Sequence, residues 1–218
     1  MATRVKTSVS LEPGDNLSRE EFHRRYSARP DIGKAELIDG VVYVPSPVRS
    51  RYHGRPHGLI VTWLGTYASL VPDVLLDDNS TIYLDGQAEV QPDAFLWRPG
   101  TGGGYETEDG YFEGAPPLVV EVAASSASYD LHQKKEAYRR NAVHEYVVWR
   151  VLDEAIDWFR LHDGEYIVAR PGADGVIESE QFPGLRLDVP RMLARDLAGV
   201  LAAVRAPASG PDGSSHAA

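Results

Sequence analysis

Three residues in this chain could together carry out chemistry: Asp93, Glu121 and Lys134. Asp93 follows Pro92 at the head of an apolar run, and Glu121 interrupts a run of aliphatic residues. Two carboxylates at one sheet edge could hold Mg²⁺, which prefers oxygen ligands and keeps several waters. Such an ion can mask the charge of a phosphodiester and acidify a water, and a nearby lysine can orient that water.

Each of these residues also has a structural interpretation. Asp93 could be a turn or strand-start residue, as is common after proline. Glu121 could form an ion pair with Lys134 or an arginine, because an unpaired buried carboxylate is costly. Lys134 and Lys135 could lie on a solvated helix face. The sequence alone leaves these alternatives open.

The residues before Glu121 predict the elements that would position Asp93. Ser18 is a suitable N-cap for a helix that ends before Pro30. Asp39-Gly40 predicts a tight hairpin turn within residues 35–44. The further predicted elements are a core-facing helix over 56–71, short strands at 74–77 and 80–83, a strand over 90–97 with Pro92 near its beginning, and a long loop over 100–114.

The residues around and after Glu121 predict a parallel crossover. Residues 118–122 are almost all apolar, as in a central strand that is covered on both faces. A helix over 129–141 and a strand over 145–151 follow, which favours a parallel strand pair. Asp130, Lys134 and Tyr138 share one face of that helix. The remaining predictions are a hairpin of 155–161 with 165–169, a short strand within 177–187 and a last helix over 190–204.

Length and composition predict one globular domain. The chain has 218 residues and no cysteine, which excludes disulfides and thiolate metal sites and is compatible with the cytoplasm. We expect neither a secretory signal nor a membrane span, because no long apolar stretch occurs. The formal net charge of −10 argues against a protein that coats nucleic acid by bulk attraction. The expected organisation is an N-terminal arm (1–16), one domain (17–204) and a disordered tail (205–218).

Two further groups of side chains have types that could bind a ligand. His53 and His57 are four residues apart, a spacing that can hold zinc, but no zincin glutamate lies between them. We therefore expect surface histidines without a metal role. Five arginines could contact phosphates or could simply be solvated charges that balance an acidic body; they are Arg49, Arg51, Arg55, Arg139 and Arg140.

Several short motifs occur together in the order found in one family. They are Glu36-Leu37-Ile38-Asp39-Gly40, Pro45-Ser46-Pro47, Pro92-Asp93, Val120-Glu121-Val122, Asp130-x-x-x-Lys134-x-x-x-Tyr138 and Glu145-Tyr146. Over residues 17–201 the chain resembles the Uma-type restriction endonuclease family, which belongs to the PD-(D/E)XK nuclease superfamily. Each motif is weak alone, and their joint order carries the resemblance.

The resemblance implies an α/β (α+β) fold, with a restriction-endonuclease-like mixed sheet flanked by helices and a metal site at one sheet edge. It implies that Asp93 and Glu121 are the metal ligands and that Lys134 takes the place of the superfamily's lysine. Glu36 matches an early glutamate near the same site, and Tyr138 matches the aromatic residue after the lysine. Without the resemblance, Glu36 could equally be a hairpin residue that faces solvent or an arginine.

The chain departs from the family pattern at two places. The superfamily usually has its lysine two residues after the glutamate, where this chain has Ala123. The family commonly uses a helix lysine instead, and Lys134 fits that pattern. The family also usually has Ser-Pro-Ser after the glutamate strand, where residues 124–128 read Ala-Ser-Ser-Ala-Ser.

The resulting hypothesis is an endonuclease that depends on Mg²⁺, or on Mn²⁺ as an alternative, and hydrolyses DNA. Asp93 and Glu121 would hold the ion, Lys134 would assist the water and Glu36 would support the site. The alternative is a catalytically inactive nuclease-fold protein that binds nucleic acid or a protein partner. A third option is a phosphodiesterase that acts on RNA or a small phosphorylated substrate. A homodimer is expected because exposed edge strands and cleavage of two strands both favour it.

Overall fold

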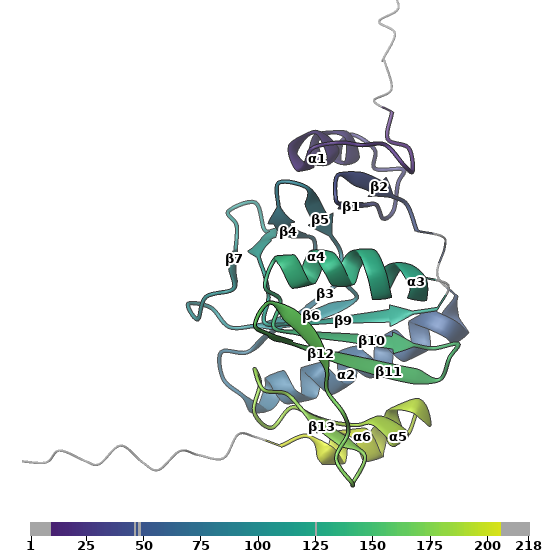
Figure 1. Ribbon diagram of the computed structural model, residues 1–218, viewed down its shortest axis with the longest axis vertical. Coiled ribbons are helices and arrows are strands. Elements are labelled where there is room, and N and C mark those ends of the chain that lie inside the picture. Colours follow the sequence, from purple (N-terminus) through teal and green to yellow (C-terminus); the bar gives the residue numbers. More distant parts are fainter. Residues whose placement is uncertain (1–9, 46, 48, 125, 206–218) are drawn as a thin grey trace, which may run out of the picture.

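The computed structural model describes residues 10–45, 47, 49–124 and 126–205. Two six-stranded sheets and a helical layer stack on one another in this part of the chain, as Figure 1 shows. The fold is therefore the expected mixed α+β arrangement of sheets and flanking helices. Residues 1–9 of the expected arm and residues 206–218 of the expected tail lie outside the described residues.

The central sheet has the strand order β12-β11-β10-β9-β6-β3. Strands β9 and β10 are parallel, as the predicted crossover requires, and the other pairs are antiparallel. All six residues of β9 are buried, because helices or strands cover both faces of the sheet. The strands are β3 (Leu75–Asp78), β6 (Ala94–Trp97), β9 (Leu118–Ala123), β10 (Glu145–Arg150), β11 (Ala155–His162) and β12 (Glu165–Val168).

The second sheet has the order β2-β1-β5-β4-β8-β7. Its β1–β2 hairpin turns at Asp39 and Gly40, which both have positive φ (53° and 75°), as the predicted two-residue turn requires. Leu11 packs against this hairpin and the first helix. The strands are β1 (Glu36–Ile38), β2 (Val41–Tyr43), β4 (Ile82–Asp85), β5 (Ala88–Val90), β7 (Gly104–Glu106) and β8 (Phe112–Gly114).

Helices cover the sheets on several sides. Ser18 Oγ accepts a hydrogen bond from the Glu21 amide, so the predicted N-cap is confirmed. A small sheet of β13 (Val176–Glu178) and β14 (Arg186–Asp188) lies beside the last two helices. The helices are α1 (Arg19–Ser27), α2 (Arg55–Leu70), α3 (Ala127–Tyr129), α4 (Lys135–Arg140), α5 (Val189–Leu193) and α6 (Leu197–Ala203), with π-helical turns η1 (Ser50–Gly54) and η2 (Asp130–Lys134).

The two faces of the central sheet pack into separate cores. Side chains on one face of β9, such as Val120 and Val122, join α2 and the C-terminal helices. Side chains on the other face, such as Val119, join Tyr138 of α4 and residues of the second sheet. Because side chains alternate along a strand, Glu121 lies on the face of Val119, between the central sheet, α4 and the second sheet.

Four sequence predictions about element boundaries are wrong. The strand predicted over 90–97 is two strands, because the chain crosses from the second sheet to the central one at residues 91–93, where Pro92 has no N–H for a ladder. The loop predicted over 100–114 contains the β7–β8 hairpin, which buries Phe112. The strand predicted within 177–187 is the β13–β14 pair.

The fourth error concerns the last helix, which is divided into α5 and α6. Arg195 has a φ of 60°, which a continuing helix cannot accommodate. Asp196 then caps the second segment by accepting a hydrogen bond from the Gly199 amide. Because Asp196 starts a new helix, the single helix that the apolar periodicity predicts over 190–204 is interrupted.

Candidate active site

Asp93 and Glu121 come together because β6 and β9 are neighbours. The register pairs Ala94 with Val120, which places Asp93 opposite Glu121 at the next position. Opposite residues in an antiparallel pair project to the same face of a sheet. The Val122 amide also donates a 2.6 Å hydrogen bond to Asp93 Oδ2, which fixes the Asp93 carboxylate against β9.

Lys134 reaches this pair from the helical layer above. Its Nζ lies 2.8 Å from Glu121 Oε1 and 2.9 Å from Glu36 Oε1, and it is 2% exposed. The shared face of Asp130, Lys134 and Tyr138 therefore turns toward the sheet. The interpretation of Lys134 as a solvated helix residue is wrong.

Two neighbours on the same helical layer complete these contacts. Tyr138 Oη donates a 3.0 Å hydrogen bond to Glu121 Oε1. Asp130 Oδ1 lies 3.9 Å from Lys134 Nζ. The π-helical turn η2 (Asp130–Lys134) carries both Asp130 and Lys134, and π-bulges occur frequently at functional sites.

Glu36 belongs to this cluster and does not face solvent. It lies on β1 of the second sheet and is 3% exposed. Its Oε1 accepts a 2.8 Å hydrogen bond from the Gln91 amide, at the segment where the chain crosses between the sheets toward Asp93. The crossing therefore ties the positions of Glu36 and Asp93 to each other.

His53 contacts the same site, although the sequence analysis placed it on the surface. Its Nε2 lies 3.1 Å from Asp93 Oδ1, and its side chain is 20% exposed. His57 Nε2 lies 3.0 Å from the Asp93 carbonyl oxygen and 2.9 Å from Asp78 Oδ1. The prediction of two surface histidines is therefore wrong, because η1 and the first turn of α2 pack beside Asp93.

All of the candidate residues except Glu36 line one cavity of about 1030 Å³. Asp93, Glu121, Asp130 and Lys134 all contribute to its wall, together with His53. The cavity lies between the β1–β2 hairpin, the end of β9 and the helical layer, so a ligand in it can contact the acids from outside. Its other charged lining residues are Lys34 and Arg49.

The carboxylates outnumber the cations in this cluster. Burial, with the charges of Asp93, Asp130 and Glu36 around it, raises the pKa of Glu121 to about 8, although Lys134 opposes this shift. Burial likewise raises the pKa of Asp130 above its ordinary value. Three buried acids lie within 3.9 Å of one buried lysine, and Asp93 adds a fourth carboxylate that acts on Glu121, which leaves an excess of negative charge.

Lys134 and Asp93 remain charged in this setting. Burial alone would lower the pKa of Lys134, but the neighbouring carboxylates of Glu121, Glu36 and Asp130 hold it well above its usual range. Burial would also raise the pKa of Asp93, but the hydrogen bond from His53 and its charge bring the net value below the ordinary one. The site therefore favours the charged forms of both the Lys134 ammonium and the Asp93 carboxylate.

Two residues of the cluster, Asp130 and His53, are absent from the predicted site residues. Asp130 was placed on the face of Lys134, and that spacing was the signal that could have added it to the site. No local signal indicated His53, because its contact with Asp93 spans 40 positions of the chain and depends on the packing of η1.

Comparison with known proteins identifies the family of this chain. The sequence model of a family described as "Uma2: Putative restriction endonuclease" matches residues 19–190. The chain belongs to this family. The expected fold and a nuclease-like function are thereby supported at the level of the family.

A solved structure is similar in fold. It is described as the crystal structure of a putative nuclease belonging to DUF820 from Anabaena variabilis ATCC 29413. The TM-score is 0.56 at 14% sequence identity, with 73% of this chain and 89% of that chain covered. No curated protein matches the chain in sequence. Among the described residues, no helix is long and apolar enough to span a membrane.

Proposed function

We propose that this protein is a metal-dependent endonuclease that hydrolyses phosphodiester bonds in DNA. The observation that carries the proposal is the buried cluster in which Lys134 contacts Glu121 and Glu36 beside Asp93, at the wall of a large cavity. Family membership supports a nuclease-like activity. The specific substrate and the metal are our inference from the chemistry of these side chains.

The donor set fits Mg²⁺, with Mn²⁺ as an alternative. Asp93 and Glu121 would hold the ion, because both carboxylates line the cavity, Asp93 from the residue before β6 and Glu121 from β9. No cluster of three or more His, Asp or Glu side chains with metal-binding geometry occurs in the described part of the chain. Mg²⁺ is commonly bound through one or two carboxylates, with waters and substrate oxygens as its other ligands. When bound, the ion would acidify a water and neutralise phosphate charge.

The protein's own residues have separable roles in this proposal. Lys134 acts as a fixed cation that orients a water and offsets charge on the phosphate, because its raised pKa prevents it from accepting a proton. Glu36 positions Lys134 through the 2.9 Å contact. Tyr138 and the Val122 amide hold the carboxylates of Glu121 and Asp93 in place.

The alternative function is a catalytically inactive nuclease fold that binds nucleic acid or a protein partner. One observation favours it: Lys134 and Tyr138 both donate hydrogen bonds to Glu121 Oε1, so this carboxylate already has two donors without an ion. Hydrolysis of RNA or of a small phosphorylated substrate would use the same residues. We also propose that the protein acts as a homodimer, because cutting both DNA strands is simplest with two sites.

Cleavage of supercoiled plasmid with Mg²⁺ tests the proposal, with labelled RNA as a parallel substrate. Asp93→Ala and Glu121→Ala should each lower the rate by at least about a thousandfold and weaken Mg²⁺ binding in calorimetry. Glu145→Gln is a matched control, because Glu145 is equally buried on the adjacent strand. A folded Asp93→Ala or Glu121→Ala protein that cuts like the parent contradicts the assignment. A parent that binds no metal at millimolar concentration supports the inactive alternative.

A further inference from the structure

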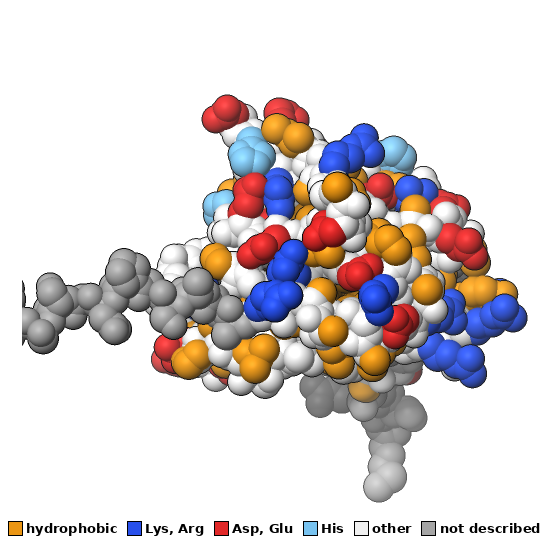
Figure 2. All heavy atoms as spheres, turned by 90° about the horizontal axis from the view of Figure 1, so that it is seen from below, with side chains coloured by type: hydrophobic (Ala, Val, Ile, Leu, Met, Phe, Trp, Pro, Cys, Tyr) orange, Lys and Arg blue, Asp and Glu red, His pale blue; other side chains and the backbone are white. Residues whose placement is uncertain are grey.

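Four exposed arginines lie close together at the N-terminal end of α2. Arg49, Arg51 and Arg55 belong to or flank η1, and Arg195 Nη2 lies 3.5 Å from the Arg51 carbonyl oxygen. None of the four forms an ion pair with a described carboxylate. Figure 2 shows Lys and Arg side chains gathered at the right-hand edge of the molecule, the end at which α2 begins in Figure 1. We call these four residues the arginine strip.

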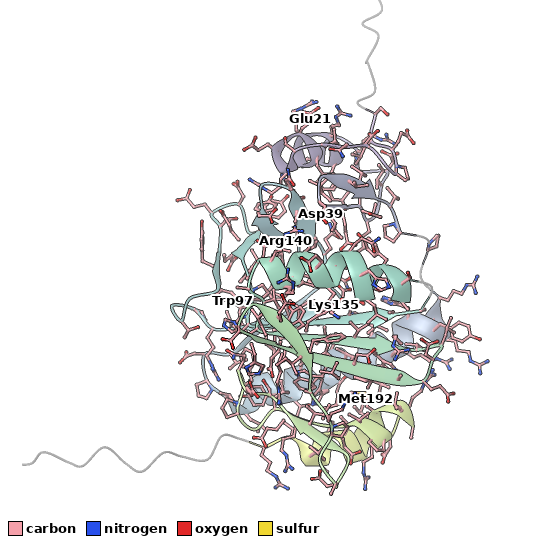
Figure 3. All side chains as sticks on the ribbon, viewed as in Figure 1. Glu21, Asp39, Trp97, Lys135, Arg140 and Met192 are labelled. Atoms are coloured by element: carbon pink, nitrogen blue, oxygen red, sulfur yellow. The ribbon has the colours of Figure 1, made fainter. Side chains whose placement is uncertain are left out.

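The other arginines that the sequence analysis considered for phosphate binding differ from this strip. Arg139 is paired with Glu136 at 2.7 Å. Arg140 is paired with Asp39 at 2.6 Å, and Figure 3 shows it on α4 below Asp39 of the β1–β2 hairpin. Their guanidinium groups already have carboxylate partners that hold the fold together, whereas those of the strip are open to an outside anion.

The arginine strip is connected to the candidate active site through η1. Arg49 lines the same cavity as Asp93 and Glu121. On the same turn, His53 points inward to Asp93 Oδ1 at 3.1 Å, while Arg51 is exposed. A polyanion held by the strip would therefore lie at the mouth of the cavity that contains the acids.

We propose that the arginine strip binds the sugar–phosphate backbone of duplex DNA and guides it to this cavity. The proposal rests on the proposed function, because it assigns the substrate contacts of the same site. The chain carries 22 Lys and Arg against 32 Asp and Glu, so most of its surface repels DNA. Unpaired arginines concentrated at one place provide the local attraction, and guanidinium groups suit phosphate oxygens through paired hydrogen bonds.

The test is fluorescence anisotropy with a labelled duplex of about 21 base pairs, two helical turns, in EDTA at several salt concentrations. The variant is the triple substitution Arg49→Gln, Arg51→Gln and Arg55→Gln. Each lost phosphate contact should lower the slope of log affinity against log salt by about 0.9, and the affinity at about 0.1 M salt by about eightfold. The control is Arg139→Gln with Arg140→Gln, which also removes positive charge from the surface.

The result supports the arginine strip if the triple variant loses at least about a hundredfold in affinity, about fivefold per charge removed, and the control loses less than about threefold per charge removed. Equal losses per charge removed in both proteins, or a parent that does not bind duplex DNA, overturn it. Preference for labelled single-stranded RNA over the duplex also overturns it. Plasmid cleavage is measured separately: binding through the strip without cleavage contradicts the proposed function alone, and cleavage by a triple variant with unchanged binding contradicts the strip alone.

Discussion

Glu121 and Glu145 are buried glutamates on the parallel strands β9 and β10, yet their surroundings differ. Glu145 accepts hydrogen bonds from the Ser179 hydroxyl, from the Glu180 amide at 3.0 Å and from Arg160 Nε at 3.4 Å. Its neighbours thus provide donors to both carboxylate oxygens. Glu145 lies at the first position of β10, where its hydrogen bonds hold residues 179–180, between β13 and β14, against the sheet.

Glu121 lies in a cluster with a shortage of positive charge. Three further acids approach Lys134 or Glu121, and the cavity opens beside them. The comparison shows that burial of a charge within an apolar strand does not by itself mark a functional site. The distinguishing features are the unbalanced negative charge and access from a cavity, because both favour binding of a cation.

The largest expected difference between the two regions is the loss of stability when the positively charged side chain beside each glutamate is removed. Lys134→Met leaves several buried carboxylates without compensation and should lower the free energy of unfolding by about 3–5 kcal/mol in EDTA. Arg160→Met should cost only about 1 kcal/mol, because Arg160 is 22% exposed and Glu145 keeps its other donors. Urea denaturation measures both values. Equal losses of unfolding free energy in the two variants would contradict the proposed shortage of positive charge around Glu121.

A smaller effect should appear as pH dependence of stability. The pKa of Glu121 is raised from 4.5 to about 8. Between these two pH values the folded protein keeps the Glu121 carboxyl protonated, whereas the unfolded chain releases that proton. In EDTA the stability should therefore fall as the pH rises from about 6 to about 8, by at most about 3 kcal/mol. Glu121→Gln should remove this slope, whereas Glu145→Gln should keep it. Thermal melts of the three proteins measure it.

Magnesium should reverse that dependence in the parent. The ion binds the ionised carboxylate, so its stabilisation should grow as the pH rises toward about 8. A parent whose pH profile matches that of Glu121→Gln, with and without the ion, would contradict the raised pKa and the metal site together.

The sequence predicts those parts of the fold that depend on local patterns. The apolar run of β9, the parallel crossover to β10 and the Asp39-Gly40 hairpin turn are confirmed. Apolar periodicity and the residues that favour tight turns depend on a few neighbouring positions, so the sequence alone can predict these elements. The division of the last helix at Arg195 was missed because an N-cap at Asp196 outweighed an otherwise continuous apolar face.

The candidate site depends on contacts that local patterns do not contain. Glu121 was selected because it interrupts an aliphatic run, but an ion pair and a metal site both remained open as its role until the family resemblance favoured the metal. The contact between Glu36 and Lys134 joins two sheets through the helical layer. That contact, and the packing of η1 against Asp93, follow from sheet pairing between distant segments, so only the structure reveals them.

The smallest predicted effect concerns the two histidines beside Asp93. His53 contacts the Asp93 carboxylate, whereas His57 contacts its backbone carbonyl and Asp78. His53→Ala should weaken Mg²⁺ binding by about tenfold, because partners that orient metal ligands typically contribute that much. His57→Ala should change it by less, since it leaves the Asp93 carboxylate and its bond from the Val122 amide in place.

Calorimetry with Mg²⁺ on both variants measures the difference, and His53→Gln is the matched rescue variant because its amide can still donate to Asp93. Partial recovery with glutamine would show that His53 acts by orienting the carboxylate. A larger loss from His57→Ala than from His53→Ala would mean that the backbone at Asp93, and not its side-chain hydrogen bond, controls the site. In that case the difference between the hydrogen-bonded Glu145 and the proposed metal site would depend on the contact of His57 with the backbone at Asp93.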